Sequence, residues 1–140
     1  MPLIGFNSLC NDHAPIIVSQ DDRNPQKHVA NNVKKSYVTH YKIDGVVIQD
    51  GNRCDFLLLN EDTKIAYLIE LKGSDLSKAA EQLEATEKKL SQELNAYSKR
   101  YRIISNKCKT TEINHSSFLK YKRKWGKNLV QRSGIYPENI

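Results

Sequence analysis

The stretch Arg53–Gly73, RCDFLLLNEDTKIAYLIELKG, contains two short apolar runs separated by a polar segment. The runs cover residues 56–59 and 65–69, and residues 60–64 lie between them. Apolar runs of this length, bounded by turn-forming residues, are typical of buried strands. The stretch therefore predicts a β-hairpin made of two buried strands.

Charged residues stand at the ends of both runs. Asp55 precedes the first run, Glu70 ends the second, and Lys72 follows two residues later. Side chains alternate between the two faces of a strand, so Glu70 and Lys72 point the same way. If the register places Asp55 beside Glu70, two carboxylates and an ammonium group meet at one edge of an apolar sheet. Two carboxylates this close stay ionised together only with a cation between them, and oxygen ligands suit Mg²⁺ or Mn²⁺. A metal ion also acidifies a bound water, which is what hydrolysis of a phosphodiester requires.

The spacing of these residues resembles the motif of the PD-(D/E)xK nuclease superfamily. Fourteen residues separate Asp55 from Glu70-Leu71-Lys72, and the motif lies on a predicted hairpin that a helix follows. That superfamily includes restriction endonucleases and Holliday-junction resolvases, and the resemblance covers about residues 30–106. It implies an α/β fold, a restriction-endonuclease-like mixed β-sheet flanked by helices with the core order αβββαβ. It also implies a Mg²⁺-dependent endonuclease in which Asp55, Glu70 and the Leu71 carbonyl hold the metal and Lys72 assists the attacking water.

The resemblance has further consequences for single residues. RecB-like relatives have a glutamine beside the active site on the helix after the motif, which implies a catalytic role for Gln82. Relatives often carry a glutamate on their first helix, whereas this chain has no glutamate before Glu61, and its nearest acid is Asp44. The departure leaves open an alternative function, a catalytically inactive nuclease-fold protein of the immunity or inhibitor type that binds nucleic acid or a protein partner. His28 and His40 could add metal ligands, but we expect solvated or capping histidines at both positions.

Periodicity and turn signals predict the remaining elements. In chain order these are a helix over residues 27–41, a strand over 42–49, a long helix over 75–99 that Ser74 or Asp75 caps, a strand over 101–105, a helix over 116–131 and a tail over 133–140. Ile16-Ile17-Val18 could form a short strand before them. We expect a single domain, with an arm over residues 1–27, a core over 28–106, and a basic C-terminal helix and tail over 107–140.

Composition narrows the class of protein. No apolar run approaches the ~20 residues of a membrane span, so we expect no membrane partner. The three cysteines are odd in number and widely spaced, which fits reduced thiols and a cytoplasmic protein better than a disulfide framework. Cys10 and His13 have the spacing of half a zinc site, but no second pair follows them.

Charge is concentrated near the C-terminus. Residues 99–132 hold eleven Lys or Arg and one acid, in a chain whose net charge is +6. A segment this basic is typical of a surface that contacts phosphates. The residues that we expect to bind nucleic acid are Lys120, Lys122, Arg123, Lys124 and Lys127. We expect DNA rather than RNA as the partner, Trp125 as an anchor of the helix, and a homodimer if both strands of a duplex are cut. A purely structural nucleic-acid-binding protein remains a further alternative.

Overall fold

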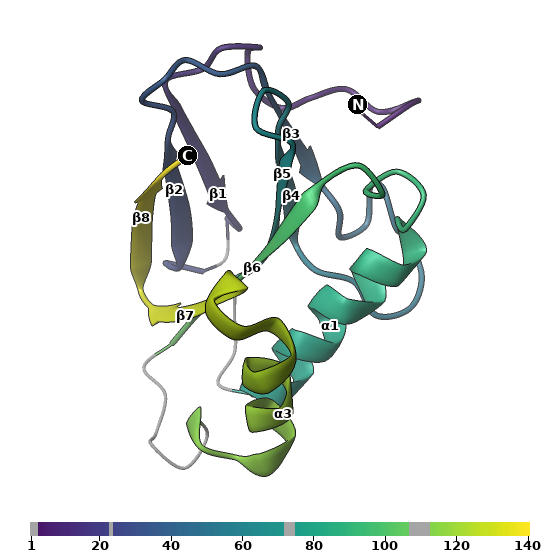
Figure 1. The fold of residues 1–140 in the computed structure, drawn as a ribbon, viewed down its shortest axis with the longest axis vertical. Helices are drawn as coiled ribbons and strands as arrows, with labels where there is room; N and C mark the ends of the chain where they lie inside the picture. Colours follow the sequence, from purple (N-terminus) through teal and green to yellow (C-terminus); the bar gives the residue numbers. More distant parts are fainter. Residues whose placement is uncertain (1–2, 23, 72–74, 107–112) are drawn as a thin grey trace.

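The computed structural model describes residues 3–22, 24–71, 75–106 and 113–140, and they form an α/β fold with two mixed sheets. The larger sheet has the strand order β3-β4-β5-β6-β7, and the smaller sheet has the order β1-β2-β8 (Figure 1). The strands of the larger sheet are β3 (Val38–Lys42), β4 (Phe56–Asn60), β5 (Ile65–Glu70), β6 (Ser98–Ser105) and β7 (Leu129–Ser133). Those of the smaller sheet are β1 (Ile16–Gln20), β2 (Lys27–Asn31) and β8 (Ile135–Asn139).

The predicted hairpin is confirmed at the centre of the larger sheet. β4 and β5 pair antiparallel, with Phe56 opposite Ile69. The side chain of Asn60 accepts hydrogen bonds from the N–H groups of Asp62 and Thr63, which closes the turn. Both strands are almost entirely buried because helices cover one face of the sheet and the smaller sheet covers the other.

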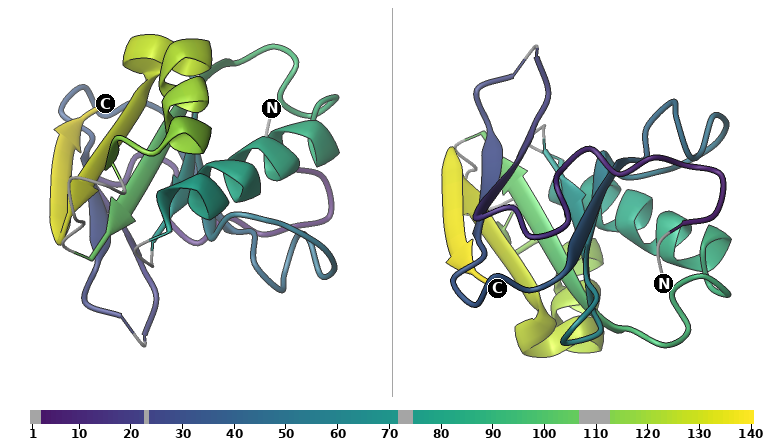
Figure 2. Two further views of the ribbon diagram at one scale, coloured as in Figure 1. Left: turned by 90° about the horizontal axis from the view of Figure 1, so that it is seen from below. Right: turned by 90° about the horizontal axis from the view of Figure 1, so that it is seen from above.

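Two α-helices lie among the described residues, α1 (Leu76–Lys89) and α3 (Ser116–Trp125), and the 3₁₀ helix η1 (Gly126–Asn128) follows α3. α1 connects β5 to β6, which run parallel, as the chain order strand–helix–strand requires. Leu57, Leu68 and Leu83 belong to the core between the helices and the larger sheet. Figure 2 shows α1 and α3 side by side on this face, while Figure 1 shows β1, β2 and β8 on the opposite side.

The helix predicted over residues 27–41 is wrong, because this segment forms β2, a turn and β3. The spacing of Val29 and Val33 fits a helix, yet Val33 is 62% exposed. The side chain of Asn32 binds the backbone of both Ala14 and Ser36, and this contact fixes the turn between the strands. The leading helix of the expected αβββαβ order is therefore absent from the described residues, whereas β3, β4, β5, α1 and β6 follow in the remaining order.

Three other boundaries differ from the prediction. Residues 43–49 form a tight turn around Gly45, whose φ is +78°, so the strand expected over 42–49 is wrong. α1 ends at Lys89, so the predicted helix over residues 75–99 is too long. The apolar residues beyond Lys89 lie in successive turns. α3 ends before Gly126, which has a φ of +55°, a conformation that glycine adopts at little cost. The residues expected as the end of this helix and as a tail form β7 and β8 instead. The strands expected at 16–18 and 101–105 are confirmed within β1 and β6.

Buried charges join the two sheets. Arg102 of β6 donates to both carboxylate oxygens of Glu138 of β8, at 2.7 and 3.0 Å. The Nε2 atom of His28, on β2, lies 2.6 Å from Oε2 of the same carboxylate. All three side chains are largely withdrawn from water, so this cluster ties β2 and β8 to the larger sheet. No helix among the described residues is long and apolar enough to cross a membrane.

Candidate active site

Asp55 and Glu70 lie together at one end of β4 and β5, the paired strands at the centre of the larger sheet. Asp55 directly precedes β4, and Glu70 is the last residue of β5. The Asp55 N–H donates to the Ile69 carbonyl at 3.1 Å, and the Leu71 N–H donates to Oδ2 of Asp55 at 2.8 Å. The backbone on both sides of Glu70 is therefore bonded to Asp55, which holds the two carboxylates next to each other.

Both acids point toward the helical face and are buried. Asp55 is 3% exposed and Glu70 is 1% exposed. Leu57 and Leu68 pack in the core beneath α1, and alternation along each strand places Asp55 and Glu70 on that same face. Burial raises the pKa of the neighbouring Cys54 thiol, and the charges of Glu70 and Asp55 raise it further. Both carboxylates therefore lie close to Cys54.

α1 fixes the chain that leads into Asp55. The buried Thr86 hydroxyl accepts the Cys54 N–H at 2.7 Å and donates to the Gln82 carbonyl at 3.0 Å. The Gln82 side chain donates to the carbonyl of Arg53 at 3.3 Å. Gln82 therefore lies near the acidic pair, and its amide contacts the backbone two residues before Asp55.

The donor chemistry of this edge fits a hard divalent cation. Mg²⁺ is commonly bound through one or two carboxylates, with water and substrate phosphate completing its six ligands. Asp55, Glu70 and the Leu71 carbonyl supply oxygen only, which matches that preference. Across the described residues there is no group of three or more His, Cys, Asp or Glu placed to hold a metal ion. Lys72, the last member of the expected site, lies outside the described residues.

The other candidate ligands are directed elsewhere. Arg53 donates to Oδ1 of Asp44 at 2.7 Å, so this carboxylate forms an ion pair at the turn before β4. His28 and His40 are buried between the two sheets, on the face opposite Asp55, and the expectation of solvated histidines is wrong. His40 shares a hydrogen bond of 2.8 Å with the Ser19 hydroxyl and stacks on a phenylalanine ring. His13 contacts the Lys35 carbonyl, which leaves the half zinc site unassembled in the part of the chain described.

The part of the basic segment that forms α3 and η1 lies on the helical face of the sheet. Its five expected contact residues, Lys120, Lys122, Arg123, Lys124 and Lys127, are all exposed. Trp125 is buried and stacks on Tyr101 with 3.9 Å between ring centroids, as expected for an anchor. Ser77 contacts Ser117 at 2.6 Å near the start of both helices, and about two turns later on each helix Lys124 contacts Glu84. α1 and α3 therefore run in the same direction, and both begin on the side of the sheet where Glu70 lies.

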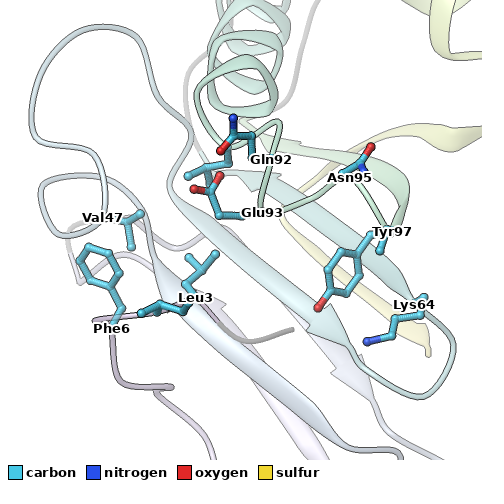
Figure 3. A pocket seen from close by; sticks show the side chains of 11 residues that line it. Leu3, Phe6, Val47, Lys64, Gln92, Glu93, Asn95 and Tyr97 are labelled. Atoms are coloured by element: carbon cyan, nitrogen blue, oxygen red, sulfur yellow. The ribbon is translucent and has the colours of Figure 1, made fainter.

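A separate apolar hollow of about 340 Å³ lies at the other end of α1 (Figure 3). Leu3, Phe6, Val47 and Tyr97 line it, and neither Asp55 nor Glu70 does. Two of its polar groups are engaged with one acid, since the Tyr97 hydroxyl donates to Glu61 at 2.6 Å and Lys64 forms an ion pair with the same residue. The hollow is therefore separate from the acidic pair of the candidate active site.

The sequence did not reveal the cluster of Arg102, Glu138 and His28. Its members come from three strands, and His28 and Glu138 stand 110 positions apart in the chain. No local spacing marks such a contact. Comparison of the chain with protein-family models, with curated proteins and with solved structures finds no match.

Proposed function

We propose that the protein is a Mg²⁺-dependent endonuclease that hydrolyses phosphodiester bonds in nucleic acid, with DNA as the preferred substrate. The observation that carries this proposal is that Asp55 bonds the backbone on both sides of Glu70, at the Ile69 carbonyl and the Leu71 N–H, where β4 and β5 meet α1. Two adjacent buried carboxylates are costly unless a cation or another positive group compensates them. A restriction-endonuclease-like arrangement of β3, β4, β5, α1 and β6 is part of the same proposal.

In this proposal each residue of the edge has a separate role. Asp55, Glu70 and the Leu71 carbonyl would hold the metal, which lowers the pKa of water and stabilises negative charge on the phosphate. Lys72 would orient the attacking water and offset the charge that develops in the transition state. Gln82 is a positioning residue, because its amide holds the backbone of Arg53.

The basic residues of α3 and η1 supply the second part of the argument. They lie exposed on a helix that runs beside α1 and starts on the side of Glu70. Lysine and arginine side chains release counterions from a nucleic acid backbone, which gives binding that weakens as salt increases. A substrate strand held along α3 would be directed toward the acidic pair.

The test is cleavage of single-stranded DNA, duplex DNA, branched DNA and RNA in Mg²⁺, Mn²⁺ or EDTA. The wild-type protein is compared with Lys72→Ala, Asp55→Asn and the matched surface variant Lys34→Ala, whose lysine is exposed in the turn before β3. We expect metal-dependent cutting that Lys34→Ala retains and that the other two variants lose by about a hundredfold or more. Equal activity in Lys72→Ala and wild type would exclude this mechanism.

One observation favours a second candidate function. Asp55 and Glu70 are 3% and 1% exposed, so a substrate phosphate reaches them only if the neighbouring chain moves. A catalytically inactive nuclease-fold protein that binds nucleic acid or a protein partner would not need such access. Absence of cutting on every substrate, together with salt-sensitive DNA binding by the wild-type protein, would support this second candidate.

A further inference from the structure

β1 is an edge strand of the smaller sheet, and the groups on its open side can be identified from its pairing. β1 pairs with β2 antiparallel, and the Asn32 N–H donates to the Pro15 carbonyl at 2.8 Å. Hydrogen-bonded pairs alternate along an antiparallel ladder, so Ile17 and Ser19 face β2 with their backbone groups. The N–H and C=O groups of Ile16, Val18 and Gln20 therefore point away from β2.

No other strand covers this edge in the described part of the chain. The smaller sheet has the order β1-β2-β8, which leaves β1 with a single neighbour. Among the described residues, no backbone hydrogen bond from a turn or loop reaches Ile16, Val18 or Gln20. An open edge of this kind is a template for another extended chain, and natural proteins usually block it with lysine, proline or a bulge. β1, with the sequence IIVSQ, contains none of these residues.

A hollow of about 740 Å³ runs along the same edge. β1 forms one wall, and Leu9, Cys10 and Phe56 contribute apolar surface on the other side. Ser19 of β1 shares a hydrogen bond of 2.8 Å with His40 of β3, and His40 also lines the hollow. A strand added to β1 would have one row of side chains directed into this space and the other row directed to solvent.

Charge identifies the kind of chain that fits. Asp21 and Asp22 lie where β1 ends, and among the lining residues that the structure describes Lys42 is the single lysine or arginine. The formal charge of this described lining is thus net negative, on a protein whose net charge is +6. A nucleic acid is a polyanion, and a second copy of β1 would bring two more carboxylates, so neither complements these charges. A basic segment does.

We propose that β1 is the docking edge for an extended, basic segment of a partner protein, which adds to the smaller sheet as an antiparallel strand. Main-chain hydrogen bonds to Ile16, Val18 and Gln20 would hold it, and alternate apolar side chains would enter the hollow. In the antiparallel direction the first residues of the segment lie beside Asp21 and Asp22, so its basic residue belongs at its N-terminal end. This proposal is independent of the nuclease activity.

The first test uses synthetic peptides and leaves the protein unchanged. The probe is a fluorescent peptide of sequence Lys-Val-Thr-Val-Thr-Val-Thr, and the control has glutamate in place of lysine. We expect saturable binding of the lysine peptide, measured by fluorescence anisotropy, and at least about fivefold weaker binding of the control. Because a strand turns alternate N–H groups to opposite sides, N-methylation of one alternate set should abolish binding while methylation of the other set spares it.

The second test changes the edge. Val18→Pro removes an N–H that makes no bond inside the sheet, and proline is tolerated at such edge positions. The matched control Val18→Thr keeps the N–H and the branched shape. We expect Val18→Pro to melt within a few degrees of the control and to bind the lysine peptide at least about fivefold more weakly. Asp22→Asn should weaken binding of the same peptide and strengthen binding of the glutamate peptide, because it removes both the attraction and the repulsion.

Two results would overturn the proposal. The first is equal binding of the lysine and glutamate peptides, or equal effects of the two N-methylated sets. The second is concentration-dependent self-association of the protein that Val18→Pro abolishes, since that result would assign the edge to a second copy of the chain.

Discussion

At the scale of single residues, the Thr86 hydroxyl connects α1 to the segment that presents Asp55. It accepts the buried Cys54 N–H and donates to the Gln82 carbonyl. Thr86→Val keeps the shape but leaves this N–H without an acceptor, which should lower the free energy of unfolding by about 1–3 kcal/mol. Thr86→Ser keeps the hydroxyl and should retain most of the stability. Urea unfolding of the two variants decides this, and equal midpoints would mean that the hydrogen bond contributes nothing.

His40 should make the protein sensitive to mild acid. Burial, and then the charge of His28, lower the pKa of His40 from 6.5 to about 4. The unfolded chain binds a proton below about pH 6.5, whereas the folded protein does not until about pH 4. Stability is therefore complete above pH 6.5 and falls by about 3 kcal/mol as the pH drops to about 4.

The measurement is urea unfolding at a series of pH values between 7.5 and 4. His40→Gln removes the titrating group while keeping a partner for the Ser19 hydroxyl, so its stability should vary less over this range. A variant that loses stability as steeply as the wild type would assign the acid response to other groups.

The contrast between Asp55 and Glu138 shows what single residues reveal in advance. The sequence predicts a site at Asp55 and Glu70 because each charged residue lies at the end of an apolar run that forms a buried strand. Glu138 stood in a segment that appeared to be a tail, and its partner Arg102 appeared to be one more member of a basic segment. Only the pairing of β8 with β2 and the proximity of β6 give these two residues their role.

At the scale of elements, the central hairpin and β6 were predictable because their apolar runs are short, continuous and bounded by polar turns. The segment over residues 27–41 was not, because Val29 and Val33 have helical spacing while β-branched residues and asparagine favour extended chain and turns. Tertiary contacts make this segment a strand, because every second residue of β2, His28 and Ala30, is buried. A buried histidine in an inward position gives no hydrophobic signal.

The start of α1 gives a prediction at this scale. The Asp75 side chain accepts the Lys78 N–H at 3.0 Å and so caps the helix. Asp75→Ala should cost about 1 kcal/mol and lower the melting temperature by about 3 °C, because one N–H of the first turn loses its acceptor. Asp75→Asn keeps an accepting oxygen and serves as the control in thermal unfolding followed by circular dichroism. A melting temperature for Asp75→Ala equal to that of Asp75→Asn would contradict the assignment of the cap.

At the scale of the whole molecule, the two sheets are joined through Glu138. Burial alone would raise the pKa of this carboxyl, but hydrogen bonds from His28 and Arg102 outweigh it and lower the pKa from 4.5 to about 2. The resulting stabilisation is present above about pH 4.5 and is lost as the pH falls toward 2, by about 3 kcal/mol. This range begins where that of His40 ends, so stability should fall in two successive steps between pH 7.5 and 2 that meet near pH 4.

Removal of the carboxylate should have a larger effect than acid. Glu138→Gln leaves the buried Arg102 without its counterion, which typically costs about 3–5 kcal/mol. Glu81→Gln, on the exposed side of α1, removes the same charge from the surface and is the matched control. Both are compared by urea unfolding at neutral pH, and a Glu138→Gln protein as stable as the control would show that the cluster is not what joins the sheets.

The pairing of β8 with β2 also governs the order in which the chain assembles. β4 and β5 meet across a short turn, whereas His28 and Glu138 are 110 positions apart, so their contact closes a very long loop. Contacts between distant segments form late because the entropy of loop closure is lost before any interaction is gained. We therefore expect the pairing of β8 with β2 to form late, after the local pairs β1–β2 and β4–β5, and to open before them in the native ensemble. Brief opening of β8 would turn the buried guanidinium of Arg102 toward solvent while the hairpin that carries the acidic pair stays folded.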